Sequence, residues 1–78
     1  MKQYIATFFS HFGAVRFQRL CAERGYEAQL APVPRSLSSS CGTCVRFEGE
    51  PPARPPEEVE QIVEVTDSGY RVLYRAEG

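Results

Sequence analysis

The chain has 78 residues, of which 42% are hydrophobic and 24% charged, and its nine basic and ten acidic side chains give a net charge of -1. A chain of this length builds one small core, so we expect residues 1–78 to form a single domain. The balanced charge argues against a duplex nucleic-acid binder, because such proteins carry a basic face.

The sequence also excludes an obvious membrane or secretory segment. No apolar run approaches the roughly 20 residues that span a bilayer, and the first 13 residues are too polar for a signal peptide. Three cysteines, an odd number, do not suit a disulfide-stapled secreted protein. We therefore expect a cytoplasmic protein with reduced thiols and no contact with nucleic acid or membrane.

The first elements are a strand and a helix. Residues 3–9 (QYIATFF) are β-branched, aromatic and apolar on both faces, which predicts a strand in the middle of a sheet. Ser10 is a suitable N-cap for a helix over residues 11–24, and Gly25 is expected to end it. The apolar stripe of this helix consists of Ala14, Phe17, Leu20 and Cys21.

The middle of the chain predicts two strands joined by a loop. Residues 26–33 (YEAQLAPV) alternate between apolar and polar side chains, and the prolines at their end place this strand at an edge of the sheet. A loop over residues 35–42 follows. Residues 43–48 (TCVRFE) predict a third strand, with Val45 and Phe47 facing the core and Cys44 facing the other way.

The last third predicts a second helix and a final strand. Residues 49–56 (GEPPARPP) form a stiff connection. A helix is predicted from about Pro56 to Thr66, since proline suits its first position and Val59, Ile62, Val63 and Thr66 form a stripe. After a turn, residues 70–75 (YRVLYR) predict the last strand.

The predicted order of elements, β-α-β-β-α-β, indicates a fold of the α+β class. Its simplest packing is a ferredoxin-like two-layer sandwich, in which two helices cover one face of a four-stranded antiparallel sheet. The other face of this sheet would be open to a homodimer partner or another protein. A plain interaction domain that uses this open face is therefore one hypothesis for the function.

Cys41 is the main candidate for chemistry, because it lies in a donor-rich loop. A thiol reacts as a thiolate, which needs exposure and nearby stabilisation of negative charge. Gly42 leaves room for close approach to the sulfur, and loop amides can form an anion-binding nest. Hydroxyl groups come from Ser38, Ser39 and Ser40, and positive charge from Arg35 and Arg46. The alternative is a flexible serine-rich loop with an incidental cysteine.

Cys44 forms a CxxC motif with Cys41, which allows a reversible disulfide or two ligands to a metal. The motif does not open a helix, as a thioredoxin-type site requires. A zinc site needs two further ligands, and the remaining candidates are Cys21 and His11. Because Cys21 lies on an apolar stripe and His11 at a helix start, we expect a core residue and a surface residue, and predict no metal site.

The run VPRSLSSSCG, followed by an apolar strand with an arginine (VRF), resembles a small bacterial family of formerly unknown function labelled selenium/sulfur (Se/S) carrier protein-like. The resemblance covers most of the chain, and the Ser-Ser-Ser-Cys-Gly core is its specific part. It implies a carrier without a cofactor, rather than an enzyme, that holds selenium or sulfur on Cys41. Cys44 and the proline-rich residues 49–56 depart from the family's pattern.

Two functional hypotheses follow. In the first, Cys41 accepts a chalcogen as a persulfide or perselenide from a donor protein and passes it to an acceptor protein, and Cys44 is either a resolving thiol or a strand residue without a role. In the second, Cys41 and Cys44 act together as a thiol redox pair or a metal-binding module.

Overall fold

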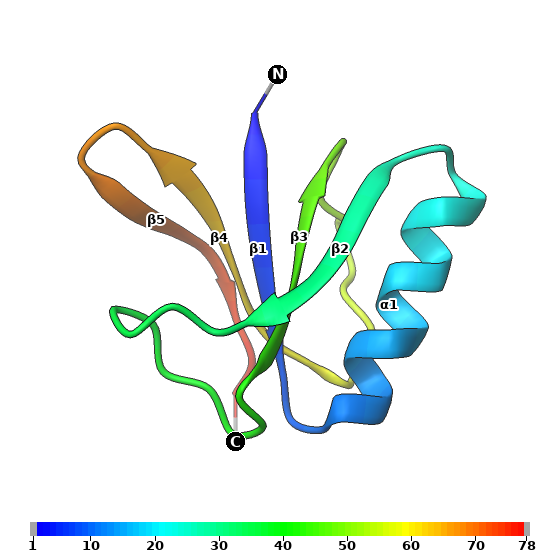
Figure 1. Ribbon diagram of the computed structural model, residues 1–78, viewed down its shortest axis with the longest axis horizontal. Helices are drawn as coiled ribbons and strands as arrows, with labels where there is room; N and C mark the ends of the chain where they lie inside the picture. Colours follow the sequence, from blue (N-terminus) through cyan, green and yellow to red (C-terminus); the bar gives the residue numbers. More distant parts are fainter. Residues whose placement is uncertain (1, 78) are drawn as a thin grey trace.

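The computed structural model, which describes residues 2–77, is a five-stranded antiparallel sheet with one helix packed on it (Figure 1). The elements in chain order are β1 (Gln3–Phe8), α1 (His11–Glu23), β2 (Glu27–Pro32), β3 (Thr43–Glu48), β4 (Val59–Thr66) and β5 (Gly69–Arg75). The strands lie in the order β2-β3-β1-β4-β5, and every neighbouring pair is antiparallel. The α+β class is correct, as are the central position of β1 and the edge position of β2.

The ferredoxin-like sandwich is wrong, because the second helix predicted from Pro56 to Thr66 is strand β4. Five of its eight residues are β-branched, a composition that fits a pleated strand better than a helix. The misleading helical spacing comes from a β-bulge. Thr7 pairs with Gln61 but Phe8 pairs with Val59, so Glu60 is an extra residue and the side chains on either side of it shift phase.

The sheet has a hydrophobic cluster on each face. The helix-side cluster joins α1 to β1, β3 and β4, and three of its aromatic rings, Phe8, Phe17 and Phe47, pack with centroids 5.3 and 5.4 Å apart. Its buried members are Tyr4, Ala6, Phe8, Ala14, Phe17, Cys21, Val45, Phe47, Val59 and Ile62. The bulge therefore puts Val59 and Ile62, three residues apart, on the same face.

The far-side cluster lies on the opposite face of the sheet and is smaller. Ile5, Cys44 and Val63 are its buried members. Partly buried side chains pack against them, namely Ala31, Val33, Leu37, Val65 and Tyr70. Val33 and Leu37 belong to the connection between β2 and β3, so this face is partly covered by the chain itself. Dimerisation through an open sheet face stays a prediction.

The predicted ends of α1 are confirmed. The Ser10 hydroxyl accepts a hydrogen bond from the Gly13 amide at 3.2 Å, as an N-cap does. At the other end Gly25 has φ +78°, and the Tyr26 amide donates to the Cys21 carbonyl at 2.9 Å. This wrap of the chain is the Schellman arrangement that glycine permits. No helix within residues 2–77 is long and apolar enough to cross a membrane.

The proline-rich connection between β3 and β4 takes the place expected for a second helix. Its prolines 51, 52 and 55 line a hollow together with Ile62 and Tyr74 of β4 and β5. The end of the connection lies beside the start of α1, where the Phe9 amide donates a hydrogen bond to the Glu58 carbonyl at 3.1 Å. Close approach there depends on Gly13, since a Cβ at this position would lie 2.6 Å from the Cβ of Glu58.

This contact predicts an unusual response to a helix-favouring substitution. Alanine in place of glycine ordinarily stabilises a helix interior by up to about 1 kcal/mol. Here Gly13→Ala is expected to lower the free energy of unfolding by about 1–3 kcal/mol, because the chain at Glu58 must move away. Thermal and urea unfolding followed by circular dichroism measure the change. Arg19→Ala, on the exposed side of α1, is the control and should shift stability by less than about 0.5 kcal/mol. A Gly13→Ala variant as stable as the wild type would contradict the packing described.

Candidate functional site

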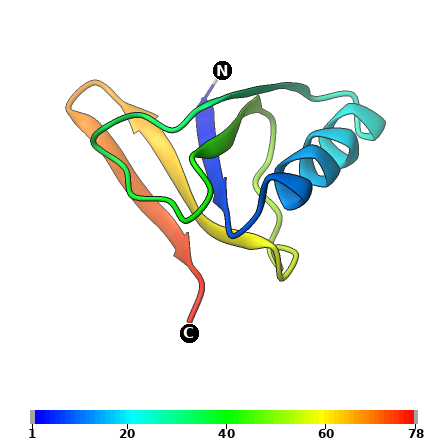
Figure 2. The same cartoon turned by 60° about the horizontal axis from the view of Figure 1, so that its bottom comes forward.

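The loop that joins β2 to β3 lies at the end of the sheet where β1 runs into α1 (Figures 1 and 2). Cys41 is two residues before the first residue of β3. The loop spans residues 33–42 and is closed by a hydrogen bond of 3.1 Å from the Val33 amide to the Gly42 carbonyl. The Leu37 amide donates to the Pro34 carbonyl at 2.9 Å, which makes a turn in its first half. Gly42 is exposed and has φ +74°, a conformation that favours glycine.

The first half of the loop is anchored by packing. Val33 and Leu37 lie against the far-side cluster of Ile5, Cys44 and Val63. The Gln61 side chain on β4 donates to the Ser38 carbonyl at 3.1 Å. The loop therefore contacts β4 as well as its own flanking strands.

The Cys41 side chain is partly buried and packs against the helix-side cluster. Its thiol donates to the Thr43 carbonyl at 3.4 Å, and its amide donates to the Ser39 hydroxyl, also at 3.4 Å. The Ser39 hydroxyl in turn donates to the carbonyl of Phe8, the last residue of β1. The sulfur is thus held in one place without being sealed in the interior.

The Ser40 hydroxyl makes the shortest hydrogen bond of the loop. It donates to Oε2 of Glu60 at 2.7 Å, and the Ser40 amide donates to Oε1 at 3.1 Å. The Thr7 hydroxyl also donates to Oε1, at 3.4 Å. Glu60 was not among the predicted site residues. The local sequence Glu58-Val59-Glu60-Gln61 does not distinguish it from the neighbouring acids, and the predicted helix assigned this segment to another layer of the fold.

His11, the first residue of α1, is exposed, as expected. It contacts Thr43, which follows Cys41 and Gly42 in the chain. Its Nδ1 shares a hydrogen bond of 3.2 Å with the Thr43 hydroxyl. Because the carbonyl of Thr43 accepts the Cys41 thiol proton, α1 helps to fix the residue that binds the sulfur. This indirect contact between His11 and Cys41 through Thr43 was not predicted from the sequence.

The remaining candidate residues are not all brought together. Arg35 and Ser38 are exposed on the loop itself. Arg46 is exposed on β3 and pairs with Ile5 and Gln29 on the face opposite α1. Its charge acts to lower the pKa of Cys44, against the larger effect of burial. Arg46 is thus placed beside Cys44, on the other face of the sheet from the cluster that contacts Cys41.

The two cysteines of the CxxC motif occupy different environments. Cys44 is fully buried in the far-side cluster, and its thiol contacts the Pro32 carbonyl at 3.6 Å. Burial raises the pKa of the Cys44 thiol, so this sulfur stays protonated. Cys41 packs against the helix-side cluster, and all three cysteines are free.

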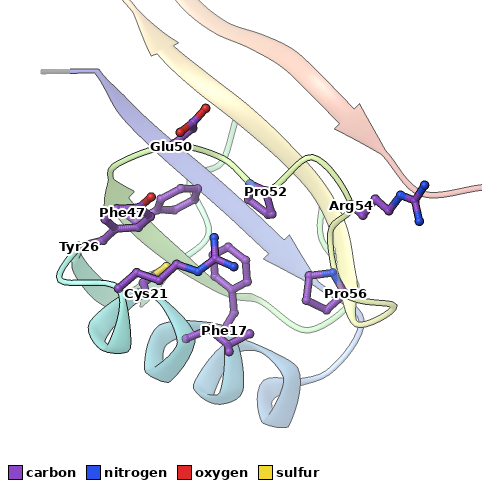
Figure 3. A pocket seen from close by; sticks show the side chains of 10 residues that line it. Phe17, Cys21, Tyr26, Phe47, Glu50, Pro52, Arg54 and Pro56 are labelled. Atoms are coloured by element: carbon purple, nitrogen blue, oxygen red, sulfur yellow. The ribbon is translucent and has the colours of Figure 1, made fainter.

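The third cysteine lines a small cavity, seen from close by in Figure 3. Cys21 on α1 is 4% exposed, which confirms the expected core position, and the cavity of about 110 Å³ lies between it, Phe17, Phe47 and the proline-rich connection. Burial raises the pKa of the Cys21 thiol, with a smaller opposing effect of Arg24. Of the three thiols, Cys41 is the one with an open side.

The described part of the chain, residues 2–77, contains no group of three or more His, Cys, Asp or Glu side chains that could hold a metal ion. A metal site built within one chain would therefore lack ligands here.

Comparisons with known proteins give one match. The model of the family described as "Putative Se/S carrier protein-like" matches residues 3–75, nearly the whole chain. No curated protein and no solved structure matches. The matched range includes the loop, Cys41 and both flanking strands.

The burial of the three thiols predicts their order of alkylation. Under native, reducing conditions Cys41 should react with iodoacetamide at least about tenfold faster than Cys21 or Cys44, because these two are buried and protonated. Peptide mass spectrometry over a time course measures the three rates, and alkylation in denaturant is the control for intrinsic reactivity. Equal native rates for Cys41 and Cys44 would contradict the placement of the two sulfurs.

The raised pKa values also predict a dependence of stability on pH. In the folded chain Cys21 and Cys44 keep their protons above the pH where cysteine ionises in an unfolded chain, about 8.5. The unfolded state then binds fewer protons, so the free energy of unfolding should fall as pH rises from about 8 to about 9.5. Urea titrations in the presence of a reductant measure this slope. A Cys21→Ala/Cys44→Ala variant should show a shallower slope, and an unchanged slope would contradict the prediction.

Proposed function

Because the chain belongs to the Se/S carrier protein-like family, we propose that it carries sulfur or selenium on Cys41 and passes the atom to an acceptor protein. The observation that supports this most directly is the state of the Cys41 thiol. It is free, partly exposed and hydrogen-bonded to Thr43, whereas the other two thiols are buried.

The transfer needs no external oxidant or reductant. The Cys41 thiolate attacks the outer, sulfane sulfur of a donor persulfide, a new S–S bond forms at Cys41, and the S–S bond of the donor breaks to release its thiolate. An acceptor nucleophile then attacks the outer sulfur and returns the Cys41 thiolate. Selenium follows the same steps, with an S–Se bond in place of the S–S bond.

Several features of the loop support this proposal. A carrier has to present the sulfur to two proteins in turn, and a fixed, partly open loop position serves both encounters. Exposed Gly42 leaves the approach to the sulfur uncrowded, since apart from its two chain neighbours no residue has a heavy atom within 4 Å of where its Cβ would be. Exposed Arg35 and Ser38 are our candidates for contacts with a negatively charged cargo or partner.

The geometry favours Cys41 alone over a pair with Cys44. A disulfide or a shared metal needs both sulfurs as thiolates, but Cys44 is buried in the far-side cluster, where burial and, to a smaller extent, the charge of Cys41 raise its pKa, whereas Cys41 packs against the helix-side cluster. We therefore propose that Cys44 is a core residue of β3, and that neither the redox pair nor the metal module is the function.

The proposed partners are a persulfide-generating or perselenide-generating donor protein and an acceptor protein. A cytoplasmic location is part of the proposal, because the thiol has to rest reduced between transfers.

Mass spectrometry of the protein after incubation with a desulfurase-type donor system and its substrate tests the proposal. We expect the wild type and Cys44→Ser to gain one sulfur or selenium atom on the peptide that contains Cys41, and Cys41→Ser to gain at most a few per cent as much. In Cys44→Ser the hydroxyl retains a possible partner in the Pro32 carbonyl, so the core should survive the change. A known carrier loaded in parallel shows that the donor works. The absence of any adduct on Cys41 beside a loaded control carrier would refute the proposal.

A further inference from the structure

Glu60 reaches the loop because of the irregularity in β4. The register of β1 with β4 skips this residue, since Thr7 pairs with Gln61 and Phe8 with Val59. Its backbone carbonyl accepts from the Ala76 amide at 2.8 Å, which fixes the main chain at the bulge. β-Bulges next to functional sites commonly redirect one side chain, and here the redirected carboxylate contacts the loop.

The carboxylate joins three donors from two other segments. Two come from Ser40, whose hydroxyl lies 2.7 Å from Oε2 and whose amide lies 3.1 Å from Oε1. The third is the Thr7 hydroxyl of β1, 3.4 Å from Oε1. Hydrogen bonds to a charged carboxylate are stronger than those between neutral groups. The bonds from Ser40 therefore tie the residue that precedes Cys41 to the middle of the sheet.

We propose that Glu60 is a positioning residue for Cys41, which holds the reactive loop on the sheet and keeps the resting thiol slow to react. The purpose of this positioning rests on the proposed carrier function, but the contacts themselves do not. With Ser40 fixed on one side and Thr43 bonded to His11 on the other, the backbone that carries the sulfur is held from both directions.

The same contacts mean that the Ser40 amide and hydroxyl bind Glu60 of the protein itself and are not free to bind a cargo atom. The amide and the hydroxyl of Ser40 converge on one carboxylate, which is the arrangement expected of a small anion-binding site. Since Glu60 occupies it, a persulfide anion on Cys41 would have to displace a charged group that is part of the chain.

The experiment compares Glu60→Gln, Glu60→Ala and Ser40→Ala with the wild type. Glu57→Gln is the matched control, because Glu57 is an exposed acid just before β4. Amide hydrogen exchange of residues 38–43 measures how firmly the loop is held. The rate of alkylation of Cys41 by iodoacetamide measures access to the thiolate, with buried Cys44 as an internal reference.

We expect Glu60→Ala to accelerate amide exchange at Ser40 and Cys41 about tenfold, and Glu60→Gln, which keeps one acceptor oxygen, to have a smaller effect. Alkylation of Cys41 should rise about three- to tenfold in Glu60→Ala, because a loosened loop exposes the thiol more often, while exchange in β5 and alkylation of Cys44 stay at wild-type values. Glu60→Ala combined with Ser40→Ala should exchange no faster than Glu60→Ala alone, since both changes break the same contact.

Two results would overturn the proposal. One is a Glu60→Ala variant whose exchange and alkylation equal those of Glu57→Gln. The other is full additivity of Glu60→Ala and Ser40→Ala, which would mean that the residues do not act through each other. Neither amide exchange nor alkylation uses a chalcogen donor, so these measurements test the positioning role of Glu60 independently of the carrier function. If a Glu60 variant is too unstable, Ser40→Ala alone still tests the contact from the loop side.

Discussion

The bulge at Glu60 is the constraint on which the arrangement around Cys41 depends. Without the extra residue, β4 would keep a regular alternation, and Val59 and Ile62 could not both pack into the helix-side cluster. The bulge also redirects the Glu60 carboxylate to Ser40, on a loop between two strands that do not neighbour β4. The bulge thus allows both side chains to pack in the core and also places the Glu60 carboxylate where it binds the loop. In this way the fold positions the loop that carries the proposed chemistry.

The three thiols lie in different surroundings, and Cys41 is the one that is partly exposed. Cys44 and Cys21 each complete a hydrophobic cluster, and burial raises the pKa of both thiols. Cys41 combines packing on its inner side with hydrogen bonds to Thr43 and Ser39, and it remains partly exposed. For a carrier this difference has a chemical advantage, since the buried and protonated Cys44 thiol is a poor nucleophile towards a persulfide on Cys41.

Much of the fold and the location of the site could be predicted from local patterns. Alternating residues gave β2 and β3, the serine cap and Gly25 bounded α1, and the donor-rich run around Cys41 marked the loop. The failure at β4 has a physical cause, because a bulged strand places Val59 and Ile62 on one face and so imitates a helix. The roles of Glu60 and His11 depend on contacts across 20 and 32 residues of sequence, which no local pattern encodes.

The central claim, that Cys41 reversibly holds a chalcogen atom, is tested most directly by following one isotopically labelled sulfur through a full cycle. The wild-type protein is loaded from a labelled donor, separated from it, and mixed with an acceptor thiol, and intact mass is recorded at each stage. For a carrier we expect one labelled sulfur per chain, bound at Cys41 and lost to the acceptor with recovery of the free thiol. A chain that never takes up the label, or that loses it by forming a Cys41–Cys44 disulfide, is not a carrier of this kind.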